Sequence, residues 1–163
     1  MHKSLFCQRS FVHRDRLVWM DLEMTGLDPD SESIIEIATI VTEGDLVLVA
    51  EGPSFAISTP EELIAGMDEW NTTHHNASGL IERVRTEGVS MAEAEQRTLE
   101  FLHEHCEPGR LPLCGSSIHH DRRFLRRYMP ELNEFFHYRN VDVSSIKEVV
   151  RRWPPRSPKF RKN

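Results

Sequence analysis

The run WMDLEMTGLD, residues 19–28, most restricts how this chain can fold, because it sets two carboxylates inside an otherwise apolar stretch. The apolar letters LVWM followed by the turn formers in TGLDPD predict a β-strand that leads into a loop. Residues two apart on a strand share one face, so Asp21 and Glu23 project the same way, roughly 6.5 Å apart at about 3.3 Å of rise per residue. Two carboxylates this close repel each other.

A divalent cation between the two acids would relieve that repulsion, since carboxylate oxygens are the ligands by which proteins usually hold Mg²⁺. The alternatives are that both side chains face solvent or that one caps a helix. The apolar neighbours Trp19 and Met20 favour the metal site. Asp121 follows LCGSSIHH at an expected passage from strand to helix and could complete the site. Its ordinary role would be a first-turn acid favoured by the helix dipole.

The remaining pattern predicts a mixed-sheet α/β domain. SIIEIATIVT and LVLVAEGPSFAIS are rich in β-branched residues, and with the first strand they predict a three-strand antiparallel meander. Pro53 in the third strand is expected at an edge or a bulge. Helices and strands then alternate. Pro60 and the capping-box spacing of Ser90 and Glu93 mark helix starts.

The next predicted elements are a buried strand in RLPLCGSS, a helix in HHDRRFLRRYM and a strand around residues 138–143. The last helix is expected to open at Ser145 and Glu148. These elements give one domain over residues 16–153, with a flexible extension at 1–15 and a basic, disordered segment at 154–163.

Charge and cysteine content narrow the functional class. The chain has a net charge of -6, and its last 13 residues carry six Lys and Arg without an acid, so the body is strongly acidic. This argues against a generally basic nucleic-acid binder. Three cysteines without a CxxC pair fit free thiols in a reducing compartment. With no run of about 18 apolar residues, we expect a cytoplasmic protein; the basic residues 1–14 leave a mitochondrial location as the alternative.

Seven segments occur along the chain in this order: DLEMTGLD, IIEIAT, MDEWN, HNASGL, CGSSIHHDRRFL, YMPEL and FHYRNVDVSS. Together they resemble oligoribonuclease, a member of the DEDD family of 3′-to-5′ exonucleases with a ribonuclease H-like fold. The resemblance covers residues 17–153. It implies hydrolysis of short oligoribonucleotides, especially dinucleotides, to nucleoside 5′-monophosphates with two divalent cations, Mg²⁺ or Mn²⁺.

The resemblance also implies roles for individual residues. Asp21, Glu23 and Asp121 match three of the four metal-binding acids. The implied substrate-binding residues are Leu27 as a wedge between two bases, Trp70 as a stacking platform, His75 and Ser117 at the substrate backbone, and Tyr138, Arg139, Ser144 and Ser145 around the 5′ phosphate. Tyr138 and Arg139 would come from the other subunit of a homodimer. Such a phosphate cap would select very short RNA.

Each of these roles has a structural alternative. Leu27 and Trp70 could belong to the core, Tyr138 and Arg139 to a purely structural interface, and Ser144 and Ser145 to a helix cap. The histidine pairs match no recognised zinc spacing, so surface or locally bonded histidines are expected.

The sequence departs from the family in two places. Ser116 and His119-His120 stand where the family has Asn and Gly-Gln, which affects how substrate is held. The family also has a His followed four residues later by an Asp beyond Trp153, and neither occurs before Asn163. If the chain ends there, a short-RNA-binding protein with impaired catalysis is expected. If it is part of a longer protein, which we favour, that protein is an ordinary member. A related exonuclease acting on longer RNA or DNA is the third alternative.

Overall fold

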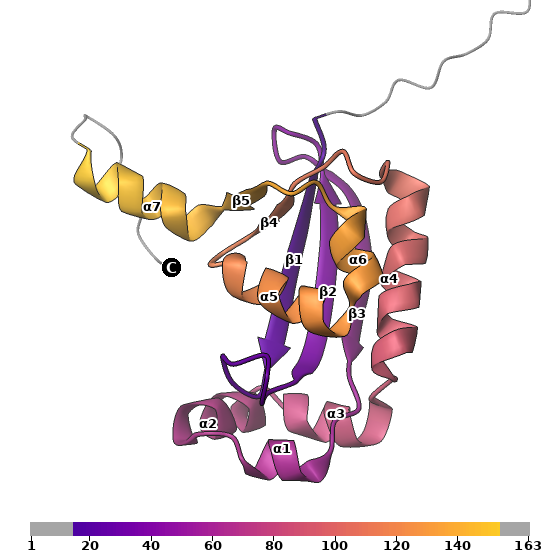
Figure 1. Cartoon of the computed structure of the whole chain (residues 1–163), viewed down its shortest axis with the longest axis vertical. Coiled ribbons are helices and arrows are strands. Elements are labelled where there is room, and N and C mark those ends of the chain that lie inside the picture. Colours follow the sequence, from indigo (N-terminus) through magenta and orange to yellow (C-terminus); the bar gives the residue numbers. More distant parts are fainter. Residues whose placement is uncertain (1–14, 154–163) are drawn as a thin grey trace, which may run out of the picture.

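Five strands form one mixed sheet in the computed structural model, which describes residues 15–153 (Figure 1). The sheet order is β3-β2-β1-β4-β5. Strands β1 (Leu17–Met24), β2 (Ile34–Thr42) and β3 (Leu48–Ala56) pair antiparallel, whereas β4 (Leu113–Gly115) and β5 (Asn140–Asp142) run parallel to β1 and to each other. The predicted meander and the mixed-sheet α/β class are confirmed. The expectations for residues 1–14 and 154–163 lie outside the described residues.

Seven helices within residues 15–153 surround this sheet. They are α1 (Glu61–Ala65), α2 (Glu69–Ala77), α3 (Leu80–Glu87), α4 (Met91–His105), α5 (His119–Tyr128), α6 (Pro130–Phe135) and α7 (Val143–Arg152). Pro60 precedes α1, and the Ser90 hydroxyl accepts a hydrogen bond from the Glu93 amide at 3.2 Å at the start of α4. Both predicted starts are confirmed. Pro53 lies on the edge strand β3, opposite a shift in pairing register, as predicted.

The start of α7 corrects one expectation. The helix begins at Val143 rather than at Ser145, and its N-cap is Asp142, whose carboxylate accepts a hydrogen bond from the Ser144 amide at 3.0 Å. An Asp side chain at the N-cap satisfies a backbone donor that would otherwise have no partner in the first turn. Helix α7 buries none of its residues and extends away from the rest of the fold (Figure 1).

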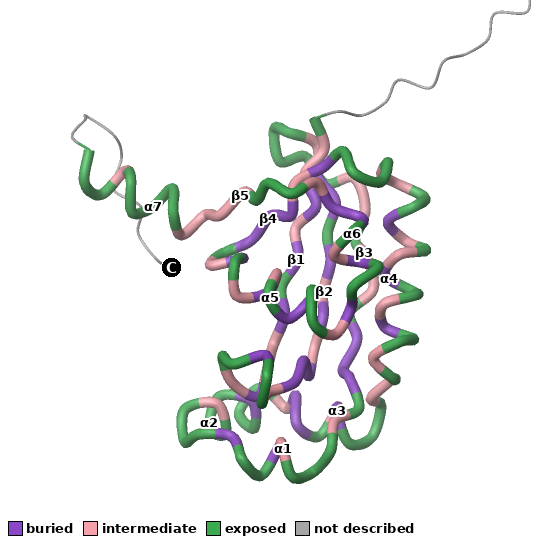
Figure 2. The backbone as a smooth tube through the Cα atoms, in the orientation of Figure 1, coloured by how far each residue is buried: buried purple, intermediate pink, exposed green. Residues whose placement is uncertain are grey.

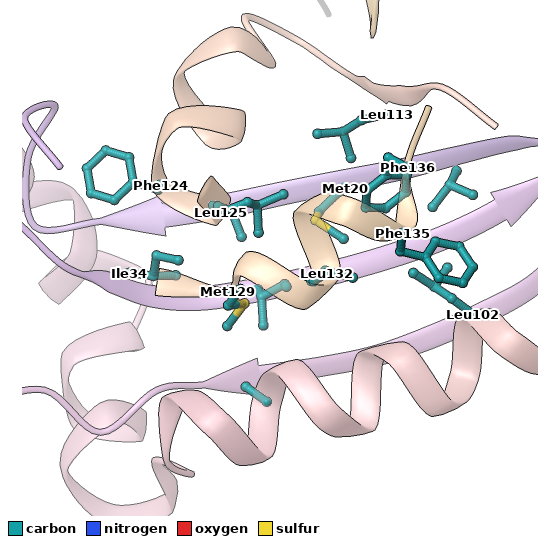
Figure 3. Packing of buried hydrophobic residues seen from close by; sticks show 14 of the residues in the cluster. Met20, Ile34, Leu102, Leu113, Phe124, Leu125, Met129, Leu132, Phe135 and Phe136 are labelled. Atoms are coloured by element: carbon teal, nitrogen blue, oxygen red, sulfur yellow. The ribbon is translucent and has the colours of Figure 1, made fainter. Parts of the chain in front are cut away.

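The main hydrophobic core lies on one face of the sheet. Even-numbered residues of β1, including Val18, Met20 and Leu22, are buried there, as expected for a strand that alternates its side chains between two faces. Helices α4, α5 and α6 cover this face with Leu102, Phe124 and other apolar side chains (Figure 3). Figure 2 shows the resulting line of buried positions along β1 and β2. Helix α4 turns Ala94, Thr98 and Leu102 towards this core.

The odd-numbered residues of β1 face the other side of the sheet. Trp19, Asp21 and Glu23 are half-buried or exposed, in contrast to the core-facing residues between them. A second apolar cluster packs α1 and α3 against the end of the sheet at which β1 ends (Figure 1). The members of this cluster are Ile35, Ala56, Ile64, Met67, Leu80, Ile81 and Val84. Asp21 and Glu23 therefore lie on the less covered face of the sheet.

The described residues include two cysteines and seven helices that bear on the sequence-based expectations. Cys106 and Cys114 are free thiols, as predicted, and burial raises the pKa of each to about 11, which makes them poorly reactive. Among the helices in residues 15–153, none has the length and apolar character that crossing a bilayer requires.

Leu102→Ala is expected to destabilise the protein by about 2 to 5 kcal/mol, because it leaves a cavity between α4 and the sheet. Leu102 is fully buried in the core cluster. Urea unfolding monitored by circular dichroism measures the change. Glu104→Ala, at an exposed position on the same helix, should change the free energy of unfolding by less than about 0.5 kcal/mol. Equal effects of the two substitutions would contradict the packing described.

Candidate active site

Asp21 and Glu23 lie on one face of β1, as the alternation of the strand requires. Antiparallel pairing with β2 places Glu36 directly opposite Glu23 and Ala38 opposite Asp21. Burial raises the pKa of Asp21, and the charge of Glu36 raises it further. Burial also raises the pKa of Glu23; His75 and, more weakly, His74 oppose this shift, while Asp21 and Glu36 add to it. The face therefore concentrates negative charge that the surrounding residues only partly compensate.

Asp121 reaches this place because β4 is short. Strand β4 pairs with β1 only at Val18 and Trp19, so the Leu22 amide lies beyond the end of that ladder. The Asp121 carboxylate accepts the hydrogen bond from this amide at 3.0 Å. Asp121 is also in the first turn of α5, so its ordinary helical role and the predicted role are compatible.

Burial determines the protonation of Asp121, which is only 6% exposed. Burial raises the pKa of its carboxyl group to about 6; the hydrogen bonds from the Leu22 amide and its own amide oppose this, and the charges of Asp21 and Glu23 reinforce it. Leu22, whose amide Asp121 binds, separates the other two acids along β1. Asp121 therefore lies beside β1, within electrostatic range of both Asp21 and Glu23.

The donor chemistry at this edge fits a hard divalent cation. All three groups are carboxylates whose pKa values are raised mainly by burial and further by neighbouring negative charge, which a cation would compensate. Their side chains do not yet form a closed metal centre: within residues 15–153, no group of three or more His, Cys, Asp or Glu is close enough to hold an ion. A bound cation would have to draw the carboxylates together.

The analysis of the sequence missed Glu36 as a fourth acid beside the site. In IIEIAT it lies between two buried isoleucines, and this alternation already indicated that it faces the other side of the sheet. Glu36 accepts a hydrogen bond from Arg83 of α3 at 2.6 Å. Like charges directly opposite each other on paired strands are unfavourable, so this ion pair reduces the repulsion between Glu36 and Glu23.

Leu27 and Trp70 are exposed, at 63% and 67%. The alternative that they are core residues is therefore wrong. Leu27 lies in the loop after β1, and two hydrogen bonds hold this loop. The Thr25 amide donates to the Ser33 carbonyl at 3.0 Å, and the Tyr128 hydroxyl donates to the Glu32 carbonyl at 2.5 Å. The loop therefore presents Leu27 at the surface, where a ligand can reach it.

His75 and Ser117 both make contacts within the fold. His75 is 1% exposed, with Nε2 3.2 Å from the Met24 carbonyl oxygen and Nδ1 4.0 Å from a Glu23 carboxylate oxygen. It therefore lies behind the site and ties α2 to the end of β1. Ser117 has a left-handed backbone with φ of 58°, and its amide donates to Asp142 at 2.8 Å.

Asp142 gathers three of the predicted substrate-binding serines. Its carboxylate accepts hydrogen bonds from the hydroxyls of Ser144 at 2.7 Å and Ser145 at 2.6 Å, in addition to the amides of Ser117 and Ser144. The alternative in which the serines themselves cap α7 is wrong, because Asp142 is the cap. Burial raises the pKa of Asp142, but these hydrogen bonds outweigh burial and lower it to about 2. An Asp before two serines was the signal that sequence analysis overlooked.

Tyr138 and Arg139 lie just before β5, apart from the acids. Arg122 of α5 holds this segment by donating to the Asn140 side chain at 2.5 Å and to the His137 carbonyl at 2.9 Å. Tyr138 is 75% exposed, and the Arg139 guanidinium lies 5.5 Å from the centre of its ring. Both side chains are therefore presented at the surface on an anchored backbone.

Known proteins are similar to this chain in sequence. The exonuclease family pattern matches residues 18–161. The oligoribonuclease of Marinobacter nauticus is 62% identical over 141 residues, which span 86% of this chain and 78% of that protein. The oligoribonuclease of Pseudomonas aeruginosa is 60% identical over 139 residues, which span 85% of this chain and 77% of that protein. The chain belongs to the oligoribonuclease family. The resemblance found in the sequence is confirmed.

Solved structures support the fold of this oligoribonuclease family member. SSB/exonuclease I in complex with the inhibitor CFAM superposes with a TM-score of 0.68 at 14% identity, covering 91% of this chain and 33% of that one. E. coli exonuclease I in complex with a 5cy-dA13 oligonucleotide gives a TM-score of 0.60 at 14% identity, covering 83% and 30%. The ribonuclease H-like fold expected from the sequence is confirmed.

Asp121→Asn is expected to stabilise the metal-free protein at pH 7.5 by on the order of 1 to 3 kcal/mol. The folded state raises the pKa of Asp121 from 3.8 to about 6, so the carboxyl stabilises the fold fully below about pH 4 and loses this contribution as the pH rises through 6. The advantage of the variant should therefore shrink towards pH 4. Urea unfolding at both pH values, with Asp30→Asn as an exposed control, measures it; a pH-independent difference would contradict the assignment.

Asp142→Ala should lower the free energy of unfolding by about 1 kcal/mol at pH 7, because α7 loses its N-cap. Asp142→Asn should cost less, since Asn also caps helices. The pKa of Asp142 is lowered from 3.8 to about 2, so the stability difference between wild type and Asp142→Asn should be complete above about pH 4 and fade as the pH falls towards 2. Chemical denaturation across pH 2 to 7 checks this; a gap that grows on acidification would contradict it.

Proposed function

We propose that this chain hydrolyses short oligoribonucleotides from the 3′ end, dinucleotides above all, and releases nucleoside 5′-monophosphates. The hydrogen bond from the Leu22 amide to Asp121, which places this acid within electrostatic range of Asp21 and Glu23, carries the proposal. It is supported by relatives that are named oligoribonuclease and are 55–62% identical over more than four-fifths of this chain.

Asp21, Glu23 and Asp121 would hold two divalent cations, Mg²⁺ or Mn²⁺. Such cations supply Lewis-acid stabilisation of the charge that develops at the scissile phosphate and at the leaving oxygen. The protein contributes the placement of the acids. The strand fixes Asp21 and Glu23 on one face, and the Leu22 amide holds Asp121 in a single orientation. The backbone of the site is thus fixed, and only the carboxylate side chains would have to move to close around the cations.

Exposed apolar side chains would bind the bases. Trp70 would stack on one base and Leu27 would lie between the two; both side chains are exposed, Trp70 on α2 and Leu27 in the loop after β1. Stacking contributes about 1 to 3 kcal/mol per base and does not depend on base identity. This accounts for a substrate class defined by length rather than by sequence.

The end of the substrate would be recognised by its 5′ phosphate. We assign this contact to Ser144 and Ser145, together with Tyr138 and Arg139 of the partner subunit in a homodimer. The exposure of Tyr138 and the fixed backbone around it support a contact with a second chain. The hydroxyl protons of the two serines are donated to Asp142 here, so each hydroxyl must rotate before it can donate to a phosphate. Ser117 and His75 would support the substrate backbone from behind. We place the protein in the cytoplasm, in line with its bacterial relatives.

Asp21→Ala should lower the rate of dinucleotide cleavage by at least about 100-fold, because it removes charge stabilisation at the reacting phosphate. Arg139→Ala should mainly raise KM, by about 10- to 100-fold, because it removes a charge-assisted contact to the 5′ phosphate. The assay follows a 5′-phosphorylated dinucleotide in Mg²⁺ or Mn²⁺ by chromatography. Arg127→Ala, an exposed arginine on α5, serves as the control and should behave as wild type.

The same assay separates the competing functions. Tight binding of the dinucleotide without cleavage would support the short-RNA-binding alternative. Rapid digestion of long single strands, with dinucleotides left intact, would favour an exonuclease for longer RNA or DNA. Comparable activity of Asp21→Ala, Arg139→Ala and wild type would refute the site assignment.

A further inference from the structure

Trp70 is exposed, yet its ring is not isolated. His74 lies four residues further along α2, and the two rings stack with centroids 4.8 Å apart and planes inclined by 9°. Side chains four residues apart lie next to each other on one face of a helix, so this pair forms within α2 itself. The imidazole therefore covers one face of the indole, while the Trp70 side chain remains largely exposed to solvent.

This stacking restricts a side chain that would otherwise be mobile. A Trp with about two-thirds of its surface exposed normally samples several rotamers, and ordering it on binding costs conformational entropy. An aromatic neighbour in a near-parallel arrangement favours one orientation of the ring. Part of the ordering cost is then met before any ligand arrives.

Helix α2 holds the pair in a defined place relative to the acids. Its first turn is capped by Asp68, which accepts a hydrogen bond from the Asn71 amide at 2.7 Å. Its last turn is fixed by the buried His75, whose Nε2 is 3.2 Å from the Met24 carbonyl oxygen at the end of β1. His74 is adjacent to His75, so the stacked pair is fixed to the strand that carries Asp21 and Glu23.

We propose that His74 is a positioning residue that supports one face of Trp70, so that the opposite face receives a nucleobase of the short RNA. This inference rests on the proposed function, because it takes Trp70 to be a base-stacking residue. His74 acts through Trp70 and does not touch the substrate. It raises affinity by holding the platform in the orientation that binds a base, and it is indifferent to which base is bound.

The test is a double-mutant cycle on binding, which does not depend on cleavage. The probe is a 5′-phosphorylated diadenosine dinucleotide in which a methylene group replaces the bridging 3′ oxygen, and calorimetry in Mg²⁺ measures its affinity. Trp70→Ala should weaken binding by about 5- to 100-fold. His74→Ala should weaken it by about 2- to 10-fold, and His74→Phe, which keeps a stacking ring, should remain within about twofold of wild type.

The double variant gives the decisive comparison. If His74 acts through Trp70, His74→Ala should cause no further loss in the Trp70→Ala background. Thr73→Ala, at an exposed position on the same helix, is the matched control and should bind as wild type, and thermal unfolding should be similar for all variants because these positions are exposed.

The outcomes distinguish this inference from the proposed function. If Trp70→Ala weakens binding while His74→Ala does not, or if His74→Ala weakens binding equally in both backgrounds, the positioning role is overturned and the proposed function stands. If wild type does not bind the dinucleotide, or Trp70→Ala binds as wild type, base stacking at this site is overturned, and the role of His74 with it.

Discussion

The hydrogen bond from the Leu22 amide to Asp121 is the contact on which the arrangement of the site depends. It exists because β4 stops after a short pairing with β1 and leaves a backbone donor without a strand partner. A buried donor of this kind must be satisfied, and a carboxylate at the start of α5 satisfies it. The need of the Leu22 amide for a hydrogen-bond partner thus places Asp121 beside the strand that carries Asp21 and Glu23.

The charge that results is unfavourable for the fold. Burial and the charges of neighbouring acids, Glu36 among them, raise the pKa values of all three acids, so the site costs stability at neutral pH. Neighbouring residues limit this cost without removing it: Arg83 binds Glu36, and His75 lies close to Glu23. Residual negative charge is what a site for divalent cations requires, so function and stability are opposed at this edge of the sheet.

Rigid backbone supports the exposed side chains around the acids. The loop bearing Leu27 is tied to Tyr128, the segment bearing Tyr138 is held by Arg122, and Trp70 stacks on His74. Asp142 links the loop before α5 to the start of α7. The molecule therefore presents large apolar groups to solvent while their backbones remain ordered, and this keeps the entropic cost of binding low.

Local periodicity in the sequence determined the meander, the shared face of Asp21 and Glu23, and the start of α4, because these depend on neighbours a few residues away. The ordered motifs also determined the family. Only the tertiary structure decided that Asp121 binds between the two acids, that Glu36 faces Glu23, that His75 is buried, and that Asp142 rather than a serine caps α7. The exposure of Leu27 and Trp70 was equally undetermined, because an apolar residue can belong to a core or to a binding surface. Each of these outcomes depends on where chain segments far apart in sequence meet, or on which of several possible acceptor side chains binds a given backbone donor.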